Sequence, residues 1–393
     1  MKLRIPLLIA SILQVIVASS QIEKQIDTSI NHTTPIIPTE KVELLKNIDV
    51  IANMQYGFNN DFQDGKYVGS AFSMNQFRLE IKGKVYKDKV YFRFRDRYTK
   101  STQPQSVDNI SASTDLAYIG VNLSPKVSMQ FGKMCADWGG YEFDANPIDI
   151  YAYNDIVEYA DNFLSGVQLG WQLTKNHSLT FQILNSRTKT FDELYDSIPG
   201  VKQSKFPAAW VANWRGNFAN GMFQTLWSAS VFTEAVDKEM HYIALGNQLL
   251  LKKWTIQYDF KWSKEGLDRK TIVTGIVPDS YDPYAAMDVA YIEHWLRFTY
   301  QFAPKWTVSG IGMVSDAYWY GNPDPHKDSH LRTAWGFIPS VEFYPFKNFN
   351  LKFFGTYIGR TYKYTDYSKK EFGSADTHTG RISIGFISPL VVL

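Results

Sequence analysis

Hydrophobic and polar side chains alternate along much of this chain, most regularly between positions 74 and 98. From Phe77 to Val85 every second residue is apolar or glycine, and the residues between them are mostly charged. After a short break the alternation resumes over residues 90–97, where arginines occupy every second position from Arg93. A period of two places successive side chains on opposite faces of a β-strand. The pattern therefore predicts two adjacent strands, each with one apolar face and one charged face.

An apolar strand face has two usual environments. In a soluble sandwich it is buried against a second sheet, whereas in an outer-membrane barrel it faces lipid and the polar face lines water. Aromatic residues make up 16% of this chain and recur near the predicted strand ends. Because barrels carry aromatic girdles at both membrane interfaces, the composition favours the barrel.

The amino terminus has the parts of a secretory signal. Lys2 and Arg4 form a basic region, residues 5–17 are apolar, and Ala18-Ser19-Ser20 supply small residues for cleavage. The apolar run is shorter than the ~20 residues of a transmembrane helix. We therefore predict a signal peptide over 1–20, a periplasmic amino-terminal segment over 21–47 and a transmembrane β-barrel domain over 48–393.

The alternating pattern recurs in about sixteen segments that run to the carboxy terminus. The predicted strands are 48–58, 70–86, 89–99, 114–124, 126–134, 163–174, 178–187, 207–217, 221–232, 240–252, 254–263, 291–303, 305–316, 332–345, 349–361 and 379–388. The segments that begin at 240 and 305 alternate less regularly than the others. An antiparallel all-β barrel of about sixteen strands is wide enough to leave an aqueous channel.

Short and long connections alternate between these strands. The short turns include Lys87-Asp88, Ser124-Pro125, Lys175-Asn176-His177, Lys253, Ala303-Pro304 and Phe346-Lys347, and the long loops are 100–113, 134–162, 187–206, 264–290, 317–331 and 362–378. Bacterial barrels have short periplasmic turns, long outer loops and an even number of strands. This spacing favours an outer-membrane barrel over an exported soluble β-sheet protein.

The charged faces of the first hairpin carry an unusual number of cations. If Lys87-Asp88 forms a two-residue turn, the facing pairs are Lys82 with Arg93, Glu80 with Arg95, and Arg78 with Arg97. We predict that the cations form a ladder along the pore wall that attracts anions, since arginine suits carboxylate and phosphate contacts. The predicted ladder residues are Arg78, Lys82, Arg93, Arg95 and Arg97. The alternative is a solvated wall whose cations pair with acidic loop residues.

Other side chains predicted to face the lumen also favour anions. The cations are Arg215, Lys261, Arg297, Lys352, Arg360 and Arg381, and the carboxylates are Asp259, Glu293 and Glu342. Walls of low dielectric constant would focus the resulting field.

The 134–162 loop is long, aromatic and acidic. Its candidate constriction residues are Asp137, Glu142, Asp144, Asp149 and Asp155. Long loops of this kind tend to be functional. Folded into the lumen, the loop would place carboxylates opposite the ladder and create a transverse field at a constriction. The alternative is an exposed outer loop.

The sequence offers little for catalysis, metals or nucleic acid. The net charge is +2, which argues against nucleic-acid binding, and the single Cys135 excludes a disulfide framework and a thiolate cluster. His326 and His330, with Asp324 and Asp328, lie in a proline-containing loop, where a solvated role is favoured over a metal site. His241 and His294 lie in strands without an evident serine partner. We predict no enzyme activity, no cofactor and no metal site.

Several segments resemble the phosphate-selective porin O/P family, in the form found among Bacteroidetes. They are residues 77–83, the 90–94 partner strand, residues 127–133 before the long third loop, and residues 166–169 after it. The resemblance implies a sixteen-stranded barrel, usually trimeric, with an infolded third loop and basic residues along the anion path. The chain departs from the family pattern because its third loop is acidic and because it ends at Leu393 rather than at an aromatic residue.

Together these observations predict a passive outer-membrane channel for small hydrophilic solutes. The prediction includes a mild preference for anions, with phosphate among the candidate solutes, contact with outer-membrane lipid, and a homotrimer. Two alternatives stay open: an exported soluble β-sheet binding protein such as a lectin, and a barrel-embedded hydrolase.

Overall fold

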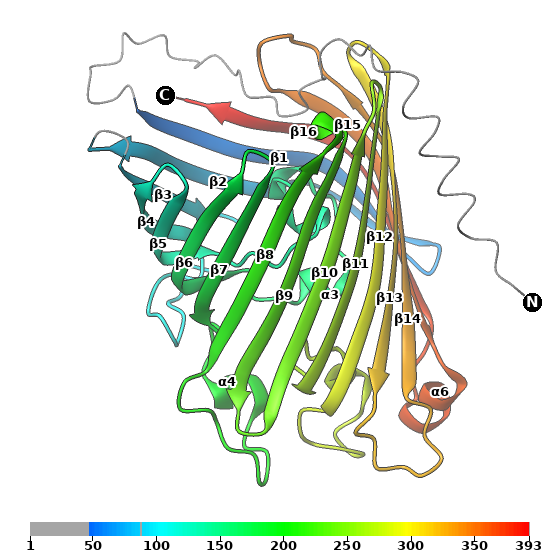
Figure 1. Cartoon of the computed structure of the whole chain (residues 1–393). Coiled ribbons are helices and arrows are strands. Elements are labelled where there is room, and N and C mark those ends of the chain that lie inside the picture. The colour runs from blue at the N-terminus through cyan, green and yellow to red at the C-terminus, as the bar shows by residue number, and fades with distance from the viewer. Residues whose placement is uncertain (1–46, 87–88, 393) are drawn as a thin grey trace, which may run out of the picture.

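The chain forms one closed barrel of sixteen antiparallel strands in a computed structural model that describes residues 47–86 and 89–392 (Figure 1). Each strand pairs with its neighbours in sequence, and the first strand pairs with the last. The strands are β1 (Ile48–Gln63), β2 (Lys66–Val85), β3 (Val90–Arg97), β4 (Thr114–Ser124), β5 (Val127–Cys135), β6 (Phe163–Thr174), β7 (His177–Asn185), β8 (Ala208–Phe218), β9 (Phe223–Ala235), β10 (Lys238–Leu250), β11 (Trp254–Leu267), β12 (Met287–Ala303), β13 (Trp306–Trp319), β14 (His330–Phe343), β15 (Lys352–Tyr364) and β16 (Thr377–Val391). The predicted signal peptide, nearly all of the predicted periplasmic segment and the Lys87-Asp88 turn lie outside the described residues.

The predicted all-β barrel and its sixteen strands are confirmed, but the hairpin formed by β1 and β2 is longer than predicted. Strands β1 and β2 continue to Gln63 and Lys66, which face each other across a turn at Asp64 and Gly65. Both turn residues have positive φ, 50° and 79°. The polar run from Asn59 to Asp61 obscured the end of β1, because the sequence there no longer shows an apolar face.

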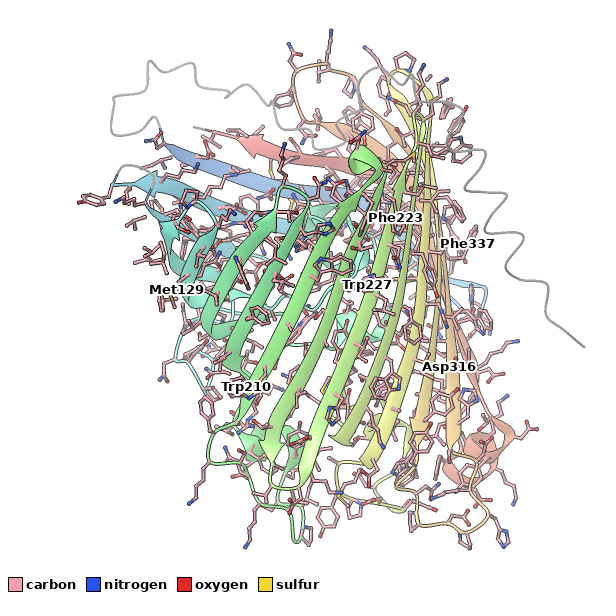
Figure 2. All side chains as sticks on the ribbon, in the orientation of Figure 1. Met129, Trp210, Phe223, Trp227, Asp316 and Phe337 are labelled. Atoms are coloured by element: carbon pink, nitrogen blue, oxygen red, sulfur yellow. The ribbon has the colours of Figure 1, made fainter. Side chains whose placement is uncertain are left out.

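Side chains on the outer surface of the barrel are largely apolar and aromatic. Trp210, Trp227 and Phe337 lie on this surface in Figure 2, and Phe337 is 59% exposed. The inward neighbours in the same strands are polar or small, as in Asn213 and Ser228. The outer surface is therefore the apolar face that the alternation predicted.

Long loops gather at one end of the barrel and short turns at the other (Figure 1). The carboxy terminus and the short helix η3 (Ala219–Gly221) lie at the short-turn end, whereas α4 (Phe191–Tyr195) and α6 (Asp366–Phe372) lie at the long-loop end. Within the described ranges, no helix is both long enough and apolar enough to cross a membrane.

A large apolar core lies inside the barrel rather than between two sheets. Inward side chains of β9, β10, β12 and β13, such as Phe232, Tyr242 and Trp319, pack against Trp138 and Ile156. The last two residues belong to the third loop, residues 136–162, which contains α2 (Tyr141–Asp144), η2 (Pro147–Asp149) and α3 (Asp155–Glu158). The sixth loop, residues 268–286, adds α5 (Ile272–Ile276) to the same core.

This internal core explains why two predicted strands alternate poorly. In β10 the inward residues include Met240, Tyr242 and Ala244, and in β13 they include Ile311 and Met313. Because loops cover these positions, the inward face is apolar and the contrast between the two faces disappears.

Candidate pore and its charged wall

The third loop crosses the lumen and is fixed by carboxylates of the barrel wall. Asp259 of β11 accepts hydrogen bonds from the backbone N–H groups of Tyr141 and Glu142, each at 2.8 Å. Glu293 of β12 accepts a hydrogen bond from the N–H of Ile156 at 2.5 Å. Since a helix leaves its first N–H groups without internal partners, these carboxylates satisfy donors at the starts of α2 and α3.

A glycine allows the loop to approach Asp259 this closely. Gly140, which precedes α2, has φ 85°, and a Cβ atom there would lie 2.8 Å from Oδ2 of Asp259. On the far side of the lumen, Gln55 of β1 donates to the carbonyl oxygen of Ile148 at 2.8 Å. The loop is therefore held at both sides of the barrel.

The five predicted constriction carboxylates pair with cations of the wall behind the loop. Asp137 and Asp144 bind Arg215, Glu142 binds Lys261, Asp149 binds Lys352, and Asp155 binds Arg332 and Arg360. Arg215 makes contacts of 3.2 Å and 2.7 Å with Asp137 and Asp144, and Lys352 makes one of 2.8 Å with Asp149. The cations belong to β8, β11, β14 and β15 rather than to the predicted ladder.

The expected position of these acids opposite the ladder is wrong for Glu142 and Asp149. The Glu142 side chain is fully buried, and neither residue lines the open part of the lumen. Asp137, Asp144 and Asp155 do line it, but each is ion-paired. The physical reason is that a buried carboxylate requires a cation, and the wall behind the loop supplies one for each acid.

An eccentric cavity of about 1230 Å³ remains between the third loop and the wall formed by β15, β16 and β1 to β6. All five predicted ladder residues line it. Among the described residues, the cationic side chains that line it are Arg78, Lys82, Arg93, Arg95, Arg97, Arg215, Arg360 and Arg381, and the carboxylates are Asp49, Glu80, Asp137, Asp144, Asp155 and Glu158. The charge excess along this cavity is therefore positive and small.

The ladder has the register predicted for the hairpin. Arg78 pairs with Arg97, Glu80 with Arg95, and Lys82 with Arg93. Glu80 accepts two hydrogen bonds from Arg93, at 2.9 Å and 3.2 Å, and lies 3.7 Å from Arg95. Lys82 lies 3.8 Å from Asp49 near an exposed part of the wall.

Asp115 is a second counter-charge in the ladder, and sequence reasoning missed it. Its carboxylate lies 3.2 Å from Arg78, 3.5 Å from Arg95 and 2.8 Å from Arg97, and its side chain is fully buried. Strict alternation places Asp115 on the lipid face with Ala117. A β-bulge changes this, because Arg95 pairs with Leu116 but Asp96 pairs with Thr114, which leaves Asp115 unpaired and turned inward.

Three guanidinium groups thus share one carboxylate. The Nε and Nη1 atoms of Arg78 and the Nε atom of Arg95 are buried without a hydrogen-bond partner in the described protein. The guanidinium groups of Arg95 and Arg97 also lie over the Phe163 ring, with Cζ 5.3 Å and 5.7 Å from its centroid. The cluster around Asp115 carries an excess of positive charge at the cavity wall.

Glu158 is a further acid of the third loop that lines the cavity. Its side chain is exposed and, within residues 47–86 and 89–392, makes no ion pair within 4.0 Å. Desolvation by the surrounding barrel, with a smaller contribution from Glu142, raises the pKa of Glu158, and Arg360 opposes this shift. Glu158 therefore supplies a titratable negative charge inside the channel.

The histidines and acids form no metal centre in the part of the chain that the structure describes. Asp324 accepts a hydrogen bond from Tyr367 at 2.9 Å, and His330 lies 3.1 Å from Asp316 on the outer side of β13 (Figure 2). His294 lies 2.9 Å from the hydroxyl of Tyr258 on the outer surface.

The closed barrel spans nearly the same residues as a match to a known protein family. The family model for phosphate-selective porin O and P matches residues 48–387. The chain belongs to this porin family. Its fold and family are those of an outer-membrane channel.

Solved structures of DcaP, OmpF and OmpT have the same fold. The channel DcaP of Acinetobacter baumannii is 13% identical with a TM-score of 0.59, and the alignment covers 88% of this chain and 99% of that chain. OmpF of Salmonella typhi, in complex with daunomycin, is 12% identical with a TM-score of 0.54 and coverages of 88% and 99%. The trimer form of OmpT from Vibrio cholerae is 10% identical with a TM-score of 0.51 and coverages of 86% and 98%. No curated protein sequence matches the chain significantly.

Proposed function

We propose that this porin is a passive diffusion channel for small hydrophilic solutes with a mild preference for anions. The observation that carries the proposal is the group of three arginines, Arg78, Arg95 and Arg97, around the single carboxylate of Asp115. A fixed excess of positive charge between walls of low dielectric constant raises the local concentration of anions. Selectivity then arises from pore width and field, and no chemical step is needed.

The preference for anions should be modest. Glu80 and Asp115 offset part of the ladder charge, and Glu158 adds a negative charge in the same cavity. Tight phosphate binding has little support, because the third loop, residues 136–162, contains no lysine, arginine or histidine. Phosphate is therefore one candidate solute among several small anions.

The proposal also includes export through a cleaved signal peptide, contact with outer-membrane lipid and assembly into a trimer. Residues 1–20 have the composition of a cleaved secretory signal, and the outer surface of the barrel is apolar, as contact with outer-membrane lipid requires. We propose a homotrimer because the OmpT relative of the same fold has a trimer form.

Planar-bilayer recording in a potassium chloride gradient tests the charge preference. We expect the wild-type reversal potential to indicate a modest excess of chloride over potassium permeation. The variant Arg93→Gln/Arg95→Gln removes two ladder charges and should shift the reversal potential toward cation selectivity. The matched control Lys252→Gln/Lys253→Gln removes two exposed charges at the short turn before β11 and should leave the potential nearly unchanged.

Folding of each variant is checked by its heat-dependent migration in SDS gels. A wild-type channel that is clearly cation-selective would refute the proposed preference. The same conclusion follows if the turn variant shifts the potential as much as the ladder variant, since the ladder position would then have no special effect.

A further inference from the structure

The two walls of the cavity differ in chemistry. The wall of β2 to β4 presents the guanidinium groups of the ladder, whereas the third loop directs its carboxylates mainly toward the opposite wall of the barrel. The loop surface on the cavity side carries apolar and aromatic side chains beside the acids Asp137, Asp144, Asp155 and Glu158. The apolar and aromatic residues include Phe143, Pro147, Ile150, Ala152, Tyr153 and Tyr159.

Aromatic rings also lie beside the guanidinium groups. Phe163 lies under Arg95 and Arg97, and Tyr118 faces Arg93 across the β3–β4 pair. Tyr118, Tyr153 and Phe163 all line the cavity. Tyr153 belongs to the third loop, so rings approach the arginines from two sides of the cavity.

Hydrogen-bond donors remain available in this part of the wall. The side chain of Arg93 is 38% exposed and that of Arg97 is 22% exposed. Each makes an ion pair on one side only, with Glu80 and Asp115 respectively. Guanidinium groups have five N–H donors, so a pair with one carboxylate leaves donors for an anion in the cavity.

We propose that this cavity binds small organic anions that carry an aromatic ring or another flat apolar group. The anionic end, a carboxylate, sulfonate or phosphate ester, lies against Arg93 and Arg97, and the apolar part lies against Tyr153 and its neighbours on the third loop. This inference rests on the proposed anion-preferring channel and adds the class of solute.

The same arrangement disfavours inorganic phosphate relative to such anions. Phosphate is polar on all sides and gains nothing from an apolar wall, yet it must lose water to approach one. An aromatic anion keeps its charge against the arginines and transfers its ring from water to the loop surface.

The test uses two permanently ionised probes, benzenesulfonate and methanesulfonate, because neither crosses lipid as a neutral acid. Chloride current through the wild-type channel is recorded in planar bilayers while each probe is added, with inorganic phosphate as a third probe. We expect benzenesulfonate to reduce the current at about one fifth of the concentration that methanesulfonate requires, the ratio that one aromatic contact supplies. Phosphate should resemble methanesulfonate.

Tyr153→Ser removes a ring from the loop and should abolish most of the difference between the two sulfonates. The control Tyr320→Ser removes a tyrosine that is 47% exposed, follows β13 and does not line the cavity, so the difference should persist. The comparison of benzenesulfonate with methanesulfonate in the wild-type channel tests the proposal even if neither variant assembles.

The outcomes separate the two proposals. A channel without anion preference in the potassium chloride gradient refutes the proposed function itself. A channel that prefers chloride but responds equally to both sulfonates overturns only the inference about aromatic anions. Stronger reduction of the current by phosphate than by benzenesulfonate also overturns it and favours an inorganic-anion channel.

Discussion

Arg97 and Asp115 form a two-point ion pair inside the barrel, with Nη2 2.8 Å from Oδ1 and Nε 3.4 Å from Oδ2. The two residues lie on strands β3 and β4, and their contact depends on the bulge that turns Asp115 inward. Arg78 and Arg95 share the same carboxylate. Asp115 therefore sets both the spacing and the net charge of the guanidinium groups at the cavity wall.

Replacing Asp115 should strengthen the anion preference. In Asp115→Asn the side chain keeps its shape but loses its charge, so the cluster gains one unit of positive charge. We expect the chloride-to-potassium permeability ratio to rise by up to about sevenfold, because one unit charge about 7 Å away in a water-like dielectric favours chloride roughly 2.7-fold and disfavours potassium by the same factor before salt screening. The measurement is the reversal potential in a salt gradient.

A matched control for this variant is Asp376→Asn. Asp376 forms an ion pair of 2.9 Å with Lys369, where both side chains are about two fifths exposed and neither residue lines the cavity. Solvent screens such a pair, so its loss should change the permeability ratio much less. Equal shifts in the two variants would show that the buried position of Asp115 has no particular influence.

The hydrogen bonds between Asp259 and the third loop should control the conductance of the pore. Asp259→Ala removes the acceptor for the N–H groups of Tyr141 and Glu142, so α2 should leave its place and widen the cavity. We expect larger and noisier single-channel currents. Gln257→Ala is the control, because Gln257 is also inward on β11 but donates to Gln248 of β10. Unchanged conductance in Asp259→Ala would mean that the other contacts of the third loop are enough to hold it in the lumen.

The strands could be predicted from the sequence because contact with lipid restricts one face of each strand. Positions such as Phe94 and Phe337 must be apolar, and a shift by one residue would expose cations such as Arg93 to hydrocarbon. The hairpin register and the ladder pairs followed from this restriction.

The partners of the third loop could not be predicted in the same way. Glu142 and Lys261 are 119 positions apart in sequence, and alternation gives no information about a loop that folds back onto a distant wall. Apolar inward residues such as Tyr242 also weakened the alternation, because the sequence does not reveal that a loop covers them inside the barrel. The inward position of Asp115 requires a bulge, which the alternating pattern does not reveal.

A charge on the outer surface should prevent stable assembly. Phe337 lies within β14 and is 59% exposed on the face that alternates with buried inward residues. Phe337→Arg should cost about 2–4 kcal/mol near the bilayer midplane. We expect less folded, heat-modifiable protein in outer-membrane fractions. Phe346→Arg, at a residue that is 55% exposed in the turn between β14 and β15, should assemble normally. Equal loss in both variants would contradict the assigned lipid face.

Titration of Glu158 should make the anion preference depend on pH. Because desolvation by its surroundings raises its pKa, Glu158 loses its charge at a higher pH than an ordinary glutamate as the pH falls from neutral. The groups that act on it are Glu142 and Asp155, which favour protonation, and Arg360 and Arg97, which oppose it. Protonation removes one negative charge from the cavity, so chloride permeation relative to potassium should increase toward acidic pH.

Glu158→Gln isolates this effect. At neutral pH the variant should already have the higher anion preference that the wild type reaches in mild acid, and its pH dependence over that interval should be smaller. The control Glu371→Gln removes an acid of α6 that pairs with Lys370 at 2.9 Å outside the cavity, so its pH profile should follow the wild type. The measurement is the reversal potential of the wild type and of both variants between neutral and mildly acidic pH. If Glu158→Gln keeps the full wild-type pH dependence, other carboxylates carry the titration and Glu158 does not set the field of the channel.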